Sequence, residues 1–167
     1  MKRILILAAA ALALTATTLA GCSTTSEVGP PIPPPAPVGA ASIVGMGAYV
    51  TSAGRDVSCA GQSVALLVDT VKMQSRMLAL YGSSSRAILP VETVKAKSAG
   101  LEPSAPPVNS AACNERGEFV FADVQPGLYF LIARVKRLPA SSAADELVIM
   151  QRVSVQPGET RHVHLAP

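Results

Sequence analysis

Apolar and polar residues alternate along the second half of the chain, and this period of two is typical of strands with one buried face. Tyr129, Leu131 and Ala133, for example, would share one face of a single strand. Pro-Gly turns at 126–127 and 157–158 separate alternating segments. The predicted strands are 118–124, 128–137, 147–155 and 160–165. Strands joined by such turns predict a mostly β protein, an antiparallel β-sandwich.

The first part of the folded region carries two further strand patterns. Residues 42–51 contain Ile, Val and Tyr with interspersed glycines, and residues 63–69 ("SVALLVD") are almost continuously apolar. A polar turn at 52–56 follows the first of them. We expect the second strand to be largely buried, because it is an almost unbroken apolar run.

The region that follows changes period. Apolar residues in 70–81 recur at helical spacing, Thr70 can cap the start and Gly82 can end the element, so we predict one short helix. Residues 83–112 are rich in Ser, Ala and Pro and predict a loop, with one strand near 88–94.

The N-terminus has the three parts of a secretory signal peptide. Lys2 and Arg3 precede the apolar run 4–14, and small residues occupy 15–21. The alternative is a membrane-spanning helix, which needs about 20 apolar residues, more than this run supplies. We therefore expect residues 1–21 to be removed.

Removal of that leader changes the charge of the protein. Two of the 14 basic residues leave with it, so 12 basic residues face 11 acidic ones in the mature chain. A nucleic-acid-binding protein needs a clear excess of basic residues. This composition therefore argues against a nucleic-acid partner.

The segment Leu19-Ala20-Gly21-Cys22 resembles the lipobox of bacterial lipoproteins. The resemblance implies cleavage between Gly21 and Cys22, a diacylglycerol on the Cys22 sulfur and acylation (palmitate) of the new N-terminus. In that family the next residue influences sorting, and Ser23 implies the outer membrane, with the domain facing the periplasm. The alternative is a free or disulfide-bonded cysteine beside an ordinary cleavage site.

The remaining cysteines are Cys59 and Cys113, an even pair in an exported chain. Disulfides persist in oxidising compartments, and one here would close a loop of 54 residues. We predict this disulfide; the alternatives are two buried free thiols or one reactive thiol.

Residues 22–40 predict a tether between the anchor and a domain at 41–167. Six prolines between positions 30 and 37 exclude a helix or a central strand and favour an extended polyproline conformation. A proline-rich docking ligand is the alternative, because Pro31 and Pro34 fit the P-x-x-P spacing.

Two motifs carry a resemblance to a known fold family. Gly117-x-Phe119-x-Phe121-x-x-Val124-x-Pro126-Gly127-x-Tyr129-x-Leu131-x-Ala133 and Val153-x-Val155-x-Pro157-Gly158-Glu159-Thr160 are similar to carboxypeptidase regulatory-like domains. The resemblance implies a transthyretin-like (prealbumin-like) sandwich of about seven strands. It implies an accessory domain without catalysis or cofactors. Many members have an aspartate before the first turn glycine, where this chain has Asn114-Glu115-Arg116.

Few residues offer chemistry. His162 and His164 would share one strand face and could be two metal ligands, but a metal site needs more. A basic cluster of Arg134, Lys136 and Arg137, with Arg152 across a strand pair, could meet anionic lipid or glycan; the alternative is an ordinary charged sheet face.

The sequence therefore favours a non-enzymatic, lipid-anchored envelope protein that acts as a binding or scaffolding module. Its partner would be an envelope protein or a glycan, met through sheet edges or the loops 52–62 and 82–112. One alternative is a periplasmic enzyme or metal-binding protein that uses His162 and His164. Another is a subunit of a larger envelope assembly.

Overall fold

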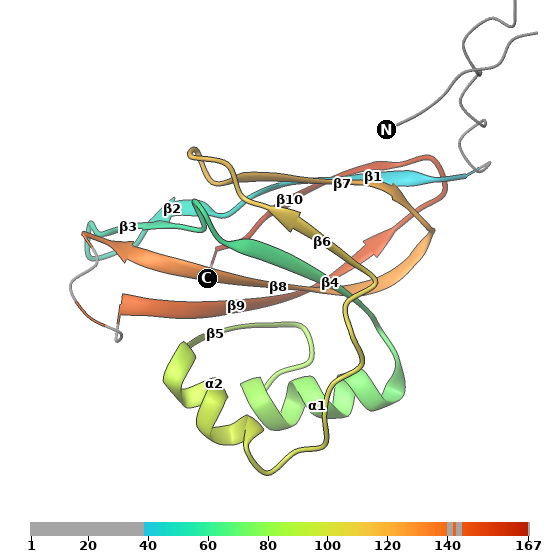
Figure 1. Ribbon diagram of the computed structural model, residues 1–167. Helices are drawn as coiled ribbons and strands as arrows, with labels where there is room; N and C mark the ends of the chain where they lie inside the picture. The colour runs from blue at the N-terminus through green and yellow to red at the C-terminus, as the bar shows by residue number, and fades with distance from the viewer. Residues whose placement is uncertain (1–38, 140–141, 143–144, 167) are drawn as a thin grey trace, which may run out of the picture. The chain divides into compact units, whose positions relative to one another are not determined.

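The computed structural model describes residues 39–139, 142 and 145–166 (Figure 1). The predicted leader, the Gly21–Cys22 cleavage site and nearly all of the predicted tether lie outside these residues. Ten strands and two helices occur in the described part. The first six strands are β1 (Ala41–Met46), β2 (Ala48–Val50), β3 (Asp56–Ser58), β4 (Ser63–Val68), β5 (Arg86–Pro90) and β6 (Asn109–Ala112). The others are β7 (Glu118–Val124), β8 (Gly127–Leu138), β9 (Glu146–Val155) and β10 (Thr160–His164), and the helices are α1 (Val71–Tyr81) and α2 (Val91–Ser98).

The strands form two sheets that face each other. The small sheet has the order β10-β1-β7, with β1 parallel to β10 and antiparallel to β7. The large, seven-stranded sheet is built on β8, which pairs with β9 along one edge and with β4 and β3 along the other. β6, β2 and β5 extend the sheet from β4, β3 and β9. The expectation of a mostly β, sandwich-like protein is confirmed. The expected antiparallel pairing does not hold between β1 and β10, which are parallel, and the described part has ten strands instead of about seven.

The stretch 42–51 illustrates why the strand count differs. It was expected to be one strand, but it leaves the small sheet after β1 and joins the large sheet as β2. Gly47 lies between the two, and a Cβ at this position would come within 2.6 Å of Cys59 Sγ. The close approach of the chain to Cys59 thus requires glycine at the crossing.

The main core lies between the two sheets. Ile43, Phe119 and Phe121 from the small sheet and Leu131 and Ile149 from the large sheet are all buried within it. The rings of Phe119 and Phe121 meet edge to face, with centroids 5.9 Å apart. Aromatic pairs favour this arrangement. The apolar residues that alternate along the second half of the chain are therefore the ones that fill this core.

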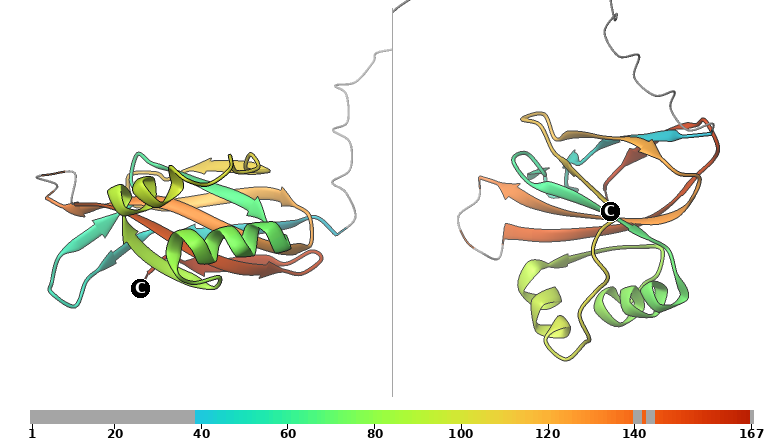
Figure 2. Two further views of the ribbon diagram at one scale, coloured as in Figure 1. Left: turned by 90° about the horizontal axis from the view of Figure 1, so that it is seen from below. Right: turned by 45° about the vertical axis from the view of Figure 1, so that its right-hand side comes forward.

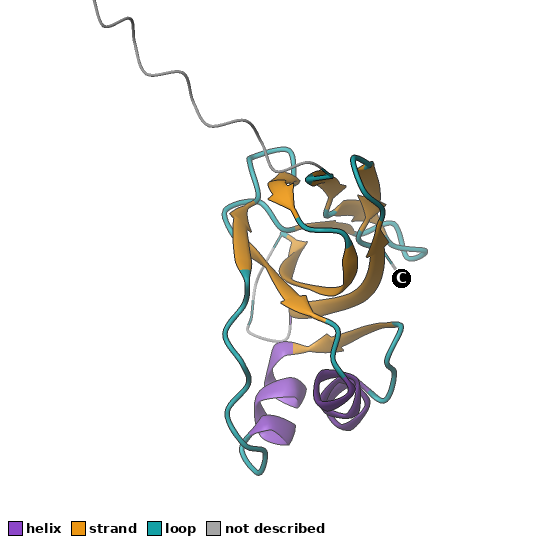
Figure 3. Cartoon of the chain, turned by 90° about the vertical axis from the view of Figure 1, so that its right-hand side faces the viewer, coloured by secondary structure: helices purple, strands orange, loops and turns teal. Residues whose placement is uncertain are grey.

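A third layer covers the outer face of the large sheet. α1 and α2 lie on the side away from the small sheet (Figures 2 and 3). They enclose a second apolar cluster with the outward-facing residues of β4, β8 and β9. Its buried members are Leu67, Met73, Met77, Leu80, Tyr81, Val91, Phe130, Val148 and Met150. The large sheet is thus apolar on both faces where the helices cover it.

The predicted helix at 70–81 is confirmed as α1, but α2 was not expected. The Thr70 hydroxyl accepts a hydrogen bond from Met73 N at 3.1 Å, and Gly82 ends α1 in the left-handed conformation with φ 71°. α2 falls within the predicted loop 83–112 and replaces the second half of the strand predicted near 88–94, of which the first half is part of β5. It buries only Val91, so its sequence has no apolar stripe to reveal it.

A disulfide joins Cys59 to Cys113, as predicted, with Cα atoms 5.8 Å apart. Cys59 follows β3 and Cys113 follows β6, so the bond joins the C-terminal ends of these two strands of the large sheet. Both residues are buried. The two cysteines are therefore neither free nor reactive thiols.

No helix among the described residues is long and apolar enough to cross a membrane.

Candidate binding site

His162 and His164 lie on the exposed outer face of β10, as their spacing predicted. They border a shallow depression of about 590 Å³ over the small sheet, together with Glu118. The described residues contain no group of three or more His, Cys, Asp or Glu that could hold a metal ion. A hydrogen bond from Asn114 and another from Arg116 lower the pKa of Glu118, so this carboxylate already has partners.

The predicted basic cluster is not assembled. Lys136 forms an ion pair with Glu146 at 3.5 Å. Arg152 binds Asp69 at 2.6 Å, next to the start of α1.

Successive side chains of a strand point to opposite faces, so Arg134 and Lys136 lie on the outer face of β8 and Arg137 lies on the other face. The positive charge of Arg137 opposes the burial that raises the pKa of Tyr49. Arg134 alone remains on the outer face of β8 without a hydrogen bond or ion pair to any described residue.

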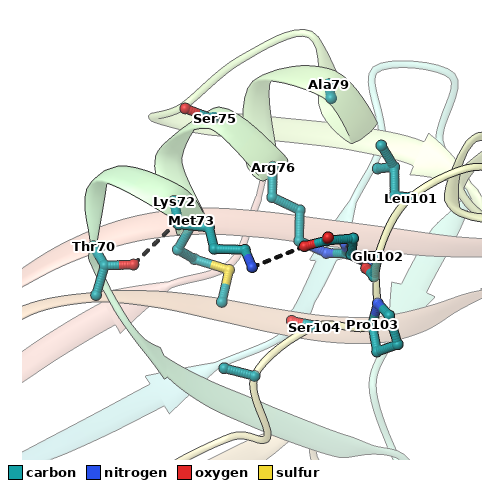
Figure 4. Close-up of a pocket in the computed structure, with 11 residues that line it drawn as sticks. Thr70, Lys72, Met73, Ser75, Arg76, Ala79, Leu101, Glu102, Pro103 and Ser104 are labelled. Carbon is teal, nitrogen blue, oxygen red and sulfur yellow. Dashed lines mark hydrogen bonds and ion pairs between the residues drawn. The ribbon is translucent and has the colours of Figure 1, made fainter.

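One groove lies between α1 and the segment 101–105 (Figure 4), and we call it the helix groove. Its volume is about 330 Å³. Its apolar lining comes from Met73, Ala79, Leu101, Pro103 and Ala105.

The polar groups of the helix groove are already engaged. Lys72 Nζ lies 2.9 Å from Glu102 Oε2, and Arg76 donates to the Glu102 backbone carbonyl. The hydrogen bond and charge of Lys72 lower the pKa of Glu102. Thr70 caps the helix, and the Ser75 hydroxyl donates to Val71 O at 3.1 Å. The contacts of Lys72 and Arg76 with Glu102 hold the segment 101–105 against α1. Because Thr70 and Ser75 bond within the helix, few groups are left to orient a polar ligand.

A second groove of about 350 Å³ lies on the outer face of the large sheet, beside the helices, and we call it the sheet groove. Its floor is apolar and consists of Ala65, Val94, Ile132 and Val148. Its polar residues are Gln62, Ser63, Tyr81 and Arg134. Strand register explains the assembly, because Ala65 pairs with Ile132 and Arg134 pairs with Val148 across three adjacent strands.

The polar side chains of the sheet groove have no partners within the described residues. Gln62, Ser63 and Arg134 form no side-chain hydrogen bond there, and neither does the Tyr81 hydroxyl. In that part of the chain, Asp69 Oδ1 is the one side-chain oxygen or nitrogen that is both fully buried and unpaired. The Tyr81 hydroxyl is therefore still reached by solvent. Burial raises the pKa of Tyr81 to about 12, against the opposing charge of Arg76, so the hydroxyl is neutral at physiological pH and can both donate and accept.

Sequence reasoning found this groove only in pieces. Gln62 lies in the predicted contact loop 52–62, and Arg134 belonged to the predicted basic cluster. Tyr81 was assigned to the core stripe of the helix, which is correct for its ring. No signal in the sequence indicated that α1 and α2 pack on the same sheet face, and this packing brings Tyr81 and Val94 to the groove.

Comparisons with known proteins support the fold alone. No protein-family model matches the chain, and no curated protein matches it. A crystal structure of a proposed carbohydrate binding protein from Pseudomonas aeruginosa is similar, with a TM-score of 0.50 and 19% sequence identity. The similarity covers 78% of this chain and 90% of that one.

Proposed function

We propose that this protein is a lipid-anchored envelope protein whose domain binds a glycan, without catalysis, in the sheet groove. The observation that carries the proposal is the convergence of unpaired polar side chains above an apolar floor. Sites for small ligands combine an apolar lining with a few polar groups that fix orientation. The helix groove has the lining but not the free polar groups.

The chemistry of the groove suits a sugar. A sugar ring presents hydroxyl groups at its edge and C–H groups on its faces. The Gln62 amide and the Ser63 and Tyr81 hydroxyls each both donate and accept, so they match sugar hydroxyls in either role. The half-buried Ala65, Val94 and Ile132 offer an aliphatic surface to a ring face. The description of the similar Pseudomonas aeruginosa structure as a proposed carbohydrate binding protein is consistent with this assignment.

For the fold in detail, we propose a transthyretin-like sandwich of the carboxypeptidase regulatory-like type. The strands β7 and β8, and likewise β9 and β10, are each joined by a Pro-Gly turn that crosses from one sheet to the other, and these two segments fall on the motifs that suggested this family. Gly117, with φ 79°, lies in the turn before β7, where a side chain would also come within 2.8 Å of Ala48 Cβ. The third layer of helices lies in the segment that matched the family poorly.

For location, we propose that Cys22 carries the lipid and that the proline-rich segment holds the domain away from the outer membrane, on its periplasmic side. One acyl chain binds a membrane only marginally, whereas two or more anchor a protein stably. The test replaces Cys22 with Ser and follows both membrane fractionation and incorporation of labelled fatty acid. A Cys22→Ser chain that still sediments with membranes and still takes up the label would refute the anchor.

The glycan assignment is tested by retention on a panel of immobilised polysaccharides and envelope glycans. We expect the full chain to bind at least one of them, and Gln62→Ala/Ser63→Ala to lose that binding. The matched control is Ser75→Ala/Ser104→Ala in the helix groove, which should bind normally. Binding to none of the glycans, or equal loss in both double variants, would contradict the proposal.

A further inference from the structure

Building on the proposed glycan function, we infer that the sheet groove selects sugars that carry a carboxylate, and that the Arg134 guanidinium binds this group. The inference concerns the class of glycan, which the fold and the comparisons leave open. It follows from the charge balance of the groove, from the placement of Arg134 and from the contrast with the helix groove.

The charge of the sheet groove is not balanced within the described part of the chain. Arg134 is the one charged residue that lines it. Neighbouring carboxylates are engaged elsewhere: Glu146 pairs with Lys136 at 3.5 Å, and Glu92 on α2 pairs with Lys95 at 2.8 Å. An anionic ligand would therefore meet an uncompensated positive charge.

The backbone of Arg134 is fixed within the sheet, so its side chain starts from a defined point at the groove. Arg134 lies on β8, whose neighbours on both sides hold it in the sheet: Val148 of β9 is its direct partner, and the adjacent Ala133 pairs with Val64 of β4. Arginine presents a planar fork of donors that matches a carboxylate with two parallel hydrogen bonds. A sugar acid seated here would place its carboxylate on Arg134, its hydroxyls near Ser63 and Gln62, and a ring face on the aliphatic floor.

The helix groove shows what a neutralised site looks like in the same protein. There, Lys72 is paired with Glu102, and Arg76 is occupied by a backbone carbonyl. The two grooves have similar volumes, about 330 and 350 Å³, and differ in whether a cation is free to bind a ligand. Of these two grooves, only the sheet groove offers an anion a cation, Arg134, that does not first have to leave an existing partner.

The test is isothermal titration calorimetry of the full chain with three probes. They are tetragalacturonate, its carboxyl-reduced neutral counterpart, and a tetraglutamate peptide as an acidic ligand that is not a sugar. The variants are Arg134→Gln, Arg134→Lys, and Arg161→Gln, an exposed arginine on β10 of the other sheet.

We expect tetragalacturonate to bind at least tenfold more tightly than the neutral sugar, the scale of one hydrogen bond to a charged group. Arg134→Gln should remove this preference, Arg134→Lys should keep part of it, and Arg161→Gln should leave it unchanged. The preference should also weaken as salt is raised.

Four results would overturn the inference, and they separate it from the proposed function. Equal binding of the acidic and neutral sugars refutes the carboxylate and leaves glycan binding standing. A preference that survives Arg134→Gln places the anion elsewhere. Tetraglutamate binding as tightly as tetragalacturonate makes the site a general acid-binding one. No binding of either sugar refutes the inference, and the panel of immobilised glycans then decides separately whether the proposed function stands.

Discussion

The pair between Arg152 and Asp69 gives the sharpest stability prediction. The Asp69 side chain is 0% exposed, and Arg152 donates from both Nε and Nη2 to Asp69 Oδ2 at 2.6 Å. Asp69 Oδ1 has no hydrogen-bond partner among the described residues. Arg152 is therefore the only charge in the described contacts that compensates this buried carboxylate.

Replacing Arg152 with Met keeps the aliphatic part of the side chain and removes the charge. Breaking a buried ion pair from one side costs about 3–5 kcal/mol, because the other charge stays buried and unpaired. Arg152 is 38% exposed, so water can partly replace it, and we expect the low end of this range, about 3 kcal/mol. Asp69→Asn in the same chain should recover part of the loss, since it removes the stranded charge.

The assay is urea unfolding followed by circular dichroism, with the disulfide intact. The control is Lys72→Met, which breaks an ion pair whose side chains are 82% and 79% exposed. Surface pairs of this kind contribute at most about 1 kcal/mol. An Arg152→Met variant that loses no more stability than Lys72→Met would refute the reasoning.

Three further predictions concern other parts of the fold. The pKa of Tyr81 is raised from 10.0 to about 12 in the folded state, so the stability that its neutral hydroxyl contributes is complete below pH 10 and is lost as pH rises through 12. Tyr81→Phe should abolish about 2–3 kcal/mol of this alkaline destabilisation in unfolding titrations. Replacing both Cys59 and Cys113 with Ala should cost about 4 kcal/mol in the chain-entropy model for a separation of 54 residues, and an unchanged urea midpoint would contradict it. Gly45→Ala should cost about 1–3 kcal/mol because the new methyl overlaps the Phe119 ring, and Phe119→Leu in the same chain should restore part of that stability.

The parts of the fold that sequence predicted are those where local pattern and tertiary packing agree. The strands β7, β8, β9 and β10 alternate because one face of each strand packs in the core between the sheets, with Phe119 and Leu131 as examples. The helix α1 combined a capping Thr70 with an apolar stripe, and both are present. The disulfide followed from the count of cysteines once Cys22 had been assigned to lipid.

The parts that sequence missed depend on contacts distant along the chain. α2 buries one residue, Val91, which is also its first, and it follows directly on Pro90, where β5 ends. β6 is largely exposed and is a strand because it pairs with β4. The parallel pairing of β1 with β10 joins the two ends of the domain and has no local signature.

The sheet groove was hidden for the same reason. Its residues come from β4, β8, β9 and both helices, or from the loop before β4. Each had an ordinary local role: Arg134 as a charge on an outer sheet face, Tyr81 as a core residue of a helix. Their common feature, polar groups without partners beside an apolar floor, exists only once the helices are packed on the sheet.

The central claim is that the sheet groove is where the protein binds its ligand, and the direct measurement is a titration of the ¹⁵N-labelled chain with tetragalacturonate, followed by NMR chemical shifts. We predict that the largest changes fall on backbone amides at 62–65, 81–82, 94, 132–134 and 148. We expect amides at 101–105 and around His162 to stay unchanged. Changes centred on the helix groove or on β10, or no saturable change at any amide, would contradict the account.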